Sequence, residues 1–278
     1  MIAQAVINNL TIGTYASGYL FTRLSGFDFP DTTVEVKSRG TYHGAVIGDK
    51  YYGRRVMTIE GEILGDTPSD YETKRRALEQ ALDILNDEQT ITFTCRSGLV
   101  VQADVILSKK IEAGYEAGKM IRGNFRIELI SAYPFLLGST ENVEEVTIGT
   151  GGGGAIPMAI PFDMTAGATG DTVIANDGNA PAFPTIRIYG AIENPTLTNL
   201  TTGKTLSVNY TLTAETDYID IDIYNRTAKD ASGNNIKRYV TGDWWTLAVG
   251  NNSIKLTGSN ASDGQLAEIT YRDSYLGV

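Results

Sequence analysis

The stretch DYIDIDIYNR, residues 217–226, carries the acidic side chains whose types and spacing come nearest to a chemical site. Asp217, Asp220 and Asp222 could supply oxygen ligands to a calcium ion, or two of them could act as the carboxyl pair of a glycoside hydrolase. A calcium ion requires six to eight oxygen ligands, and no loop of closely spaced acids with a glycine accompanies these residues. We therefore predict neither a metal site nor a catalytic pair here.

The same stretch is better explained as one strand of a sheet. Neighbouring side chains of a strand point to opposite faces, so Ile219, Ile221 and Ile223 share one face while Asp220 and Asp222 share the other. Burying each isoleucine contributes roughly 1.5 to 3 kcal/mol, which fixes the register of the strand. The pattern predicts a half-buried strand whose aspartates face water.

Nucleophilic catalysis and zinc binding also find little support. Cys95 is the one cysteine and His43 the one histidine, which excludes an intrachain disulfide and the usual Cys/His zinc site. Cys95 shares a predicted strand face with Ile91 and Phe93, which favours a buried structural thiol over a nucleophile. No G-x-S-x-G motif occurs. We predict no catalytic residue, no metal and no cofactor, and a protein that is not an enzyme.

Length and charge limit the class of protein further. The 278 residues are enough for two domains, and the net charge of -10 argues against sequence-specific recognition of nucleic acid. No stretch reaches the roughly 18 to 20 apolar residues that span a bilayer, and the first ten residues lack the features of a signal peptide. We expect no membrane insertion and a chain that is made in the cytoplasm.

A glycine-rich stretch, residues 149–157, marks the clearest domain boundary. Five glycines among six residues leave the backbone too free to hold a fold, and the Lys and Ser or Thr of a phosphate-binding loop do not follow them. The sequence therefore predicts a first domain at 1–148, a linker at 149–157 and a second domain at 158–278.

The first domain has the pattern of an α+β fold with one helix on a sheet or split barrel. Thr67 can cap a helix that starts at Pro68 and runs to about Asn86, and strands are expected at residues 54–64, 90–95, 99–107 and 123–130. Residues 39–55 and 109–120 resemble long hairpins that reach for a partner. Their candidate interface residues, chosen as types enriched in interface centres, are Tyr51, Tyr52, Arg54 and Tyr115.

The second domain consists of short alternating segments separated by Gly, Asn, Asp and Pro, with no helical pattern. This predicts a two-sheet antiparallel β-sandwich or jelly roll. Trp244 and Trp245 could contact a sugar, but alternation favours one tryptophan between the sheets and the other outside.

Both halves together resemble the distal tail protein (Dit) family of long-tailed, non-contractile bacteriophages. The first-half likeness lies in residues 51–93, which contain KRRALEQAL, and in FRIELISAYPFLLG at 125–138. The second-half likeness lies in NDGNAPAFPTIRIYG and its continuation at 176–209, in IDIYNRT at 221–227 and in WWTLAVGNNSI at 244–254. The segments occur in the same order, and the resemblance covers nearly the whole chain.

This resemblance implies a structural protein of the virion that is made in the host cytoplasm. Its N-terminal domain would form a hexameric ring at the tail tip, through which DNA can pass, and its C-terminal galectin-like sandwich would project outward. The implied partners are sibling copies, the tail tube protein, the hub or tail-associated protein and the receptor-binding protein. Larger members carry an inserted carbohydrate-binding module, for which this chain has no room.

Two other functions stay open at this stage. The first is a carbohydrate-binding module for adhesion to cell walls, which would depend on Trp244 or Trp245. The second is a glycoside hydrolase or esterase, which would depend on Asp217, Asp220 or Asp222 and which no motif supports.

Overall fold

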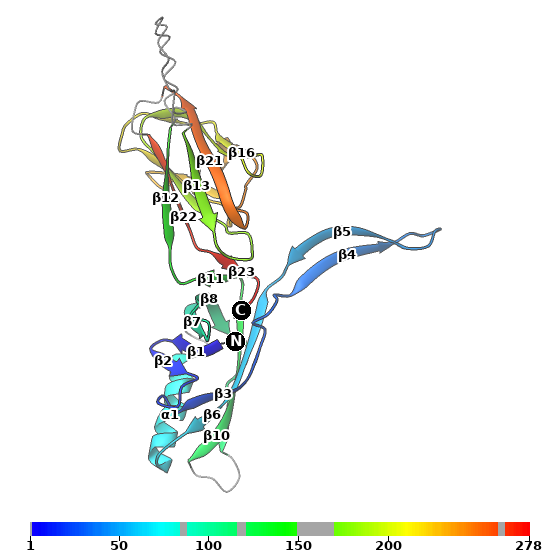
Figure 1. The fold of residues 1–278 in the computed structure, drawn as a ribbon, viewed down its shortest axis with the longest axis vertical. Helices are drawn as coiled ribbons and strands as arrows, with labels where there is room; N and C mark the ends of the chain where they lie inside the picture. The colour runs from blue at the N-terminus through cyan, green and yellow to red at the C-terminus, as the bar shows by residue number, and fades with distance from the viewer. Residues whose placement is uncertain (1, 84–87, 116–120, 149–169, 261–264) are drawn as a thin grey trace, which may run out of the picture. The chain divides into compact units, whose positions relative to one another are not determined.

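A computed structural model describes residues 2–83, 88–115, 121–148, 170–260 and 265–278 (Figure 1). The chain divides into two compact units, one formed by Met1–Ser139 with Tyr275–Val278 and the other by Thr140–Ser274. The predicted fold class, mainly β with a mixed first part and an antiparallel sandwich in the second, is confirmed.

The first unit is built on one antiparallel sheet, in which the strands follow the order β2-β1-β7-β8-β10-β6-β3. β9 adds to β10, and β11 adds to β8. The sequence predicted β6, β7, β8 and β10, and β9 as part of a hairpin, but neither β11 nor any strand of this sheet before residue 54. The bounds are β1 (Ile2–Ile7), β2 (Leu10–Ile12), β3 (Tyr19–Ser25), β6 (Arg55–Leu64), β7 (Gln89–Cys95), β8 (Val100–Leu107), β9 (Glu112–Tyr115), β10 (Arg122–Ser131) and β11 (Leu136–Gly138).

Strict alternation along β6 and β10 shows why these strands form the centre of the first unit. Met57, Ile59 and Ile63 of β6 are fully buried, whereas Glu60 and Glu62 between them are half-buried. β6 pairs with β10 over ten residues, so the apolar faces of the two strands coincide. The register places the core on one side of the sheet and a polar face on the other.

The helix α1 (Pro68–Ala81) starts where the sequence predicts, because Thr67 accepts a hydrogen bond from the backbone N–H of Asp70 at 3.1 Å. It ends at Ala81, earlier than the predicted Asn86. Leu82 leaves the helical conformation, and its side chain packs in the core of the first unit. The helix therefore ends where Leu82 packs into the core, although the helical pattern of the sequence continues beyond it.

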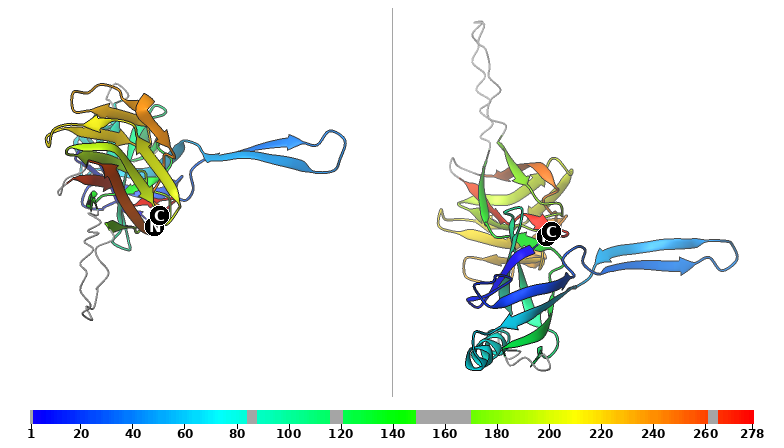
Figure 2. Two further views of the ribbon diagram at one scale, coloured as in Figure 1. Left: turned by 90° about the horizontal axis from the view of Figure 1, so that it is seen from above. Right: turned by 60° about the horizontal axis from the view of Figure 1, so that its bottom comes forward.

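A two-stranded hairpin stands apart from this sheet. β4 (Thr32–Ser38) and β5 (Ala45–Tyr52) pair with each other and belong to no other sheet in the described part of the chain. Figures 1 and 2 show it as a separate ribbon that leaves the other strands of its unit. The predicted hairpin at residues 39–55 covers only its turn and second strand, so the hairpin begins seven residues earlier than we predicted.

The second unit is an antiparallel sandwich of two sheets with a shared apolar core. One sheet has the order β12-β22-β14-β18-β19, and the other β13-β21-β15-β16-β20 with β17 beside β15. A short 3-10 helix, η1 (Lys237–Tyr239), precedes β20, and the short strand β23 (Ser274–Tyr275) follows the sandwich. The sandwich strands are β12 (Asn142–Thr147), β13 (Asp171–Asn176), β14 (Thr185–Tyr189), β15 (Ile192–Asn199), β16 (Lys204–Val208), β17 (Thr211–Leu212), β18 (Tyr218–Asp222), β19 (Thr227–Asp230), β20 (Val240–Gly242), β21 (Gly250–Ser259) and β22 (Leu266–Tyr271).

The division between the units falls elsewhere than at the predicted boundary. β12 lies within the predicted first domain, 1–148, but it pairs with β22 along its whole length and buries Val146 in the second core. The last four residues, within the predicted second domain, 158–278, return to the first unit. The predicted linker, residues 149–157, lies outside the described residues.

Candidate interaction surface

Asp217, Asp220 and Asp222 lie on and beside β18, and each carboxylate has its own hydrogen-bond partners within the chain. The carboxylate of Asp217 accepts hydrogen bonds from the backbone N–H groups of Ala214 and Thr213 at 3.0 and 3.1 Å, and these bonds lower its pKa. Asp222 accepts from the backbone and side chain of Asn225 at 2.9 and 2.7 Å, as expected for a turn. Both acids stabilise local backbone.

Asp220 is held by Arg187 on the adjacent strand β14. The guanidinium donates two hydrogen bonds to the carboxylate, one of them at 2.8 Å, and lies 4.5 Å from the ring centre of Tyr218. The hydrogen bonds with Asp220 raise the pKa of Arg187. Within the described ranges, no group of three or more His, Cys, Asp and Glu side chains could hold a metal ion.

The remaining chemical candidates are not brought together. Cys95 is buried in the core of the first unit, and His43 lies in the exposed turn of the β4–β5 hairpin. Trp245 is fully buried and its indole N–H donates to the carbonyl of Leu197 at 3.4 Å. Trp244 is half-buried beside Lys237, whose Nζ lies 6.0 Å from the ring centre. The structure therefore places one tryptophan inside the sandwich, where no sugar reaches it, and the other at its surface.

The β4–β5 hairpin, which we call the arm, is the most unusual surface of the described chain. Every residue of both strands is exposed. Two residues of β5, Gly48 and Asp49, stand opposite the single Glu35 as a bulge, while β4 alternates regularly. Because opposed residues share a face, one side carries the apolar side chains of Val34, Val36, Ala45, Ile47 and Tyr52 together with Thr32, Ser38 and Lys50, and we call this side the apolar face.

The opposite face of the arm is more polar. It presents Thr33, Glu35, Lys37, Val46 and Tyr51, and Lys37 forms an ion pair with Glu35 at 2.8 Å. The arm is thus amphipathic, and beyond Tyr52 at its root the apolar side chains Val34, Val36 and Ile47 remain about half exposed. Isolated two-stranded hairpins are marginally stable in water, so an uncovered apolar face of this kind indicates a binding surface.

The predicted interface residues have different places at the root of the arm. Tyr51 and Arg54 are exposed, whereas the ring of Tyr52 contacts the buried Phe135 edge to face, with ring centres 5.3 Å apart. Tyr115 ends β9, and its side chain is outside the part of the structure that can be described. Of the four, Tyr51 and Arg54 are free to meet a partner, and Tyr52 also joins the arm to its unit.

Arg55, the first residue of β6, fixes this root and was missed at the sequence level. Its fully buried guanidinium donates to the carbonyl oxygens of Pro134 at 2.9 Å, Gly26 at 2.9 Å and Leu276 at 2.5 Å. Burial lowers the pKa of Arg55 to about 10. The Arg55 guanidinium thus joins three segments that are distant in the sequence. The one sequence signal for its burial is its position in an alternating strand, on the same side as the buried Met57.

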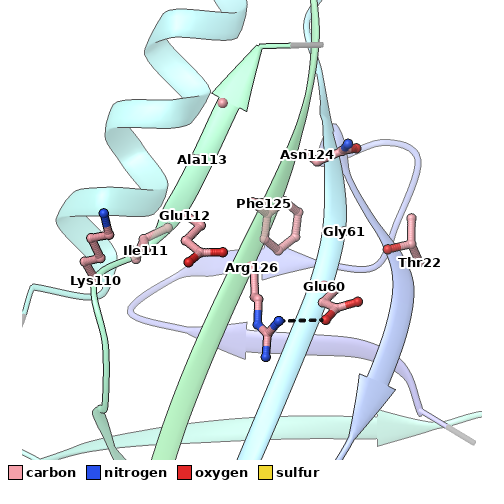
Figure 3. A pocket seen from close by; sticks show the side chains of 11 residues that line it. Thr22, Glu60, Gly61, Lys110, Ile111, Glu112, Ala113, Asn124, Phe125 and Arg126 are labelled. Carbon is pink, nitrogen blue, oxygen red and sulfur yellow. Dashed lines mark ion pairs between the residues drawn. The ribbon is translucent and has the colours of Figure 1, made fainter.

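Two cavities of about 710 Å³ open on the first unit. The first, shown in Figure 3, lies over β6, β9 and β10, where Arg126 points toward Glu60 at 3.6 Å. Next to it, Lys109 pairs with Glu128 at 2.9 Å. Its acids thus have cationic neighbours, which suits a contact surface better than an acid–base pair. The second cavity lies between β1 and β3 and is lined by Ile2, Leu20, Phe21, Leu24, Phe27 and Val278, among others.

Comparison with known proteins identifies a relative for the C-terminal part of the chain. Residues 177–275 match the family described as "Siphovirus-type tail component, C-terminal domain". The match lies almost wholly within the second unit. The resemblance to the distal tail family is thereby confirmed for these residues.

One solved structure shares the fold of the chain. The Dit protein of phage SPP1, described as a paradigm of the hub adsorption apparatus of phages that infect Gram-positive bacteria, is 16% identical over 98% of both chains, with a TM-score of 0.66. This likeness shows a shared fold over nearly the whole chain.

Two structures of the phage P2 baseplate in its activated conformation are also similar, each at 12% identity. The one with calcium covers 100% of both chains with a TM-score of 0.48, and the one with strontium covers 97% of both with a TM-score of 0.45. No curated protein sequence matches the chain significantly. Among the helices in the described part of the chain, none has the length and hydrophobicity to cross a membrane.

Proposed function

We propose that this protein is the distal tail protein of its phage, a hexameric ring that joins the tail tube to the host-adhesion device. The main observation that supports this proposal is the arm, because both of its strands are wholly exposed and one of its faces is largely apolar. Such an arm requires a partner surface, as a ring subunit does. The resemblance to distal tail proteins supports the number six and the position at the tail tip, and the shared fold is consistent with it.

The two units would divide the work. The first unit, which bears the arm, would form the ring and contact the tail tube and hub proteins. The sandwich would face outward as a galectin-like domain to which receptor-binding components dock. The paired carboxylates around β18 support a structural role for the sandwich, since each already has a partner within the chain.

The mass of the protein in solution tests the proposal. Light scattering should give six times 30.0 kDa for the full chain, and removal of residues 33–51 should give a folded monomer. Deletion of residues 114–118 tests the second predicted hairpin and Tyr115 in the same assay. A monomer at every concentration, together with complete tails on phage that lack the arm, would contradict the proposal.

A further inference from the structure

The cavity between β1 and β3 has the form of a sheet that lacks one strand. Over the described residues, Leu20–Ser25 of β3 pair with β6 on one side, and Ile2 of β1 pairs with β7 on one side. β2 covers β1 only from Ala5 to Ile7. The other edges of β1 and β3 border the same cavity, which we call the slot. Unpaired strand edges of this kind bind extended chains.

The lining of the slot is apolar at its floor and charged at its rim. Ile2 and Phe27 are buried at the floor, and Phe21 and Leu24 are half-buried. Arg23 and Arg96 are exposed at the rim. An occupant that fits must therefore be extended, apolar on one side and tolerant of water on the other.

The arm is a segment of the same polypeptide with these properties. Its apolar face carries Val34, Val36 and Ile47, with Lys50 beside Val34, and its other face carries the Glu35–Lys37 ion pair, which can remain solvated. The carboxylate of Asp49 in the bulge would also suit the arginines at the rim of the slot.

The arm is badly placed to fill the slot of its own copy. Phe27 and Asp28 line that slot, and the arm begins only four residues later, at Thr32. Val36 and its partner Ile47 then lie about 13 Å further along the strand, at about 3.3 Å per residue. Because the arm starts beside the slot and extends away from it, its apolar face lies too far along the arm to enter that slot. The face is available to a different molecule instead.

We propose that the apolar face of the arm of one copy binds in the slot between β1 and β3 of the next copy. This inference rests on the proposed function and names the two surfaces that would meet in it. The contact is head to tail, because arm and slot are different surfaces, and repeated contacts of this type close into a ring when the rotation between copies allows.

Two adjacent arm residues provide a matched test. Ile47 on the apolar face is 60% exposed and Val46 on the opposite face is 49% exposed, so either tolerates substitution in the free chain. Ser25 is exposed and lines the slot. Protein with Ile47→Cys is mixed with protein with Ser25→Cys, and a short bismaleimide cross-linker is added. The native Cys95 is buried and should not react in the folded protein.

The expected result is a covalent dimer in this mixture, in roughly tenfold higher yield than with Val46→Cys and Ser25→Cys, because docking raises the effective concentration of the paired thiols. Ile47→Asp should also reduce the mass of the assembly, whereas Val46→Asp should leave it unchanged. Equal yields from the two cysteine positions would overturn the inference. If the assembly still forms in that case, the proposed ring stands and the arm binds elsewhere; if the wild-type chain stays monomeric as well, both fail.

Discussion

Two hairpins of this protein alternate in the same way and yet end in opposite environments. In β18 and β19 of the sandwich, Ile219 and Ile221 are completely buried. In the arm, Val34 and Val36 occupy equivalent alternate positions and remain about half exposed. Alternation decides which side chains share a face, but only the second layer of the fold decides whether that face is covered. In the proposed ring, another copy supplies this layer for the arm.

The largest expected effect comes from the cores of these two hairpins. Ile221→Ala should lower the free energy of unfolding by about 2 to 5 kcal/mol, because it leaves a cavity between the two sheets. Val36→Ala should change it by about 0.5 kcal/mol or less in the monomer, since the valine is already in water. Urea denaturation of both variants at low protein concentration measures the difference. Similar losses would mean that the arm is packed against its own unit.

The root of the arm should give the next effect. Arg55→Met leaves three buried carbonyl oxygens without their charged donor, and we expect a loss of at least about 2 kcal/mol in the free energy of unfolding. Arg55→Lys should recover only part of this loss, because an ammonium does not reproduce the fork of a guanidinium. The same urea titrations apply, and an unchanged midpoint for Arg55→Met would contradict the role given to this residue.

The two tyrosines at the end of β5 provide a smaller contrast. Tyr52→Ala removes the edge-to-face contact with Phe135 and should cost about 0.5 to 1.5 kcal/mol in the unassembled chain. Tyr51→Ala should leave the stability of the chain unchanged and weaken assembly instead, because Tyr51 lies exposed on the arm. Thermal unfolding and light scattering of the two variants separate the effects; a reversed pattern would exchange their roles.

The smallest expected effect is on the pH dependence of stability in acid. The hydrogen bonds of Asp217 hold its pKa below the usual value of 3.8, so its contribution to stability is complete above that pH and is lost as the pH falls through the lower, folded-state pKa. Asp217→Asn should therefore unfold with a shallower dependence on pH below about 3.8 than the wild type. Acid titrations followed by circular dichroism compare the slopes. Identical slopes would show that this carboxylate is not linked to folding.

The sequence predicted those parts of the fold in which local pattern and tertiary contact agree. Spacing alone predicts the capped start of α1 and the strand around Ile219 and Ile221. It also predicts that one of Trp244 and Trp245 is buried and the other lies at the surface. It did not predict β1 to β3, or β4, in which Thr32–Ser38 has no buried face to mark it as a strand. The boundary at Ser139 was also missed, because glycine content indicates a free backbone and not which core Val146 enters.

For the candidate interaction surface, residue types led us to propose Tyr51 and Arg54, which are exposed, but did not predict the bulge that sorts the arm into two faces. That bulge depends on Gly48 and Asp49 facing one residue, which becomes visible only when the two strands are paired. Arg55 was hidden for a similar reason, since its three acceptors come from residues 26, 134 and 276.

The bond from Arg55 to Leu276 has a consequence for synthesis on the ribosome. Residues 140–274 form a contiguous unit that can fold as soon as it emerges, whereas the first unit needs residues made after that unit is complete. The backbone N–H of Val278 also donates to Phe27 at 3.0 Å, a short distance before the arm begins. A nascent chain would therefore hold a folded sandwich while the base of its arm is still loose, and the arm would become firmly mounted only after residues 275–278 have emerged.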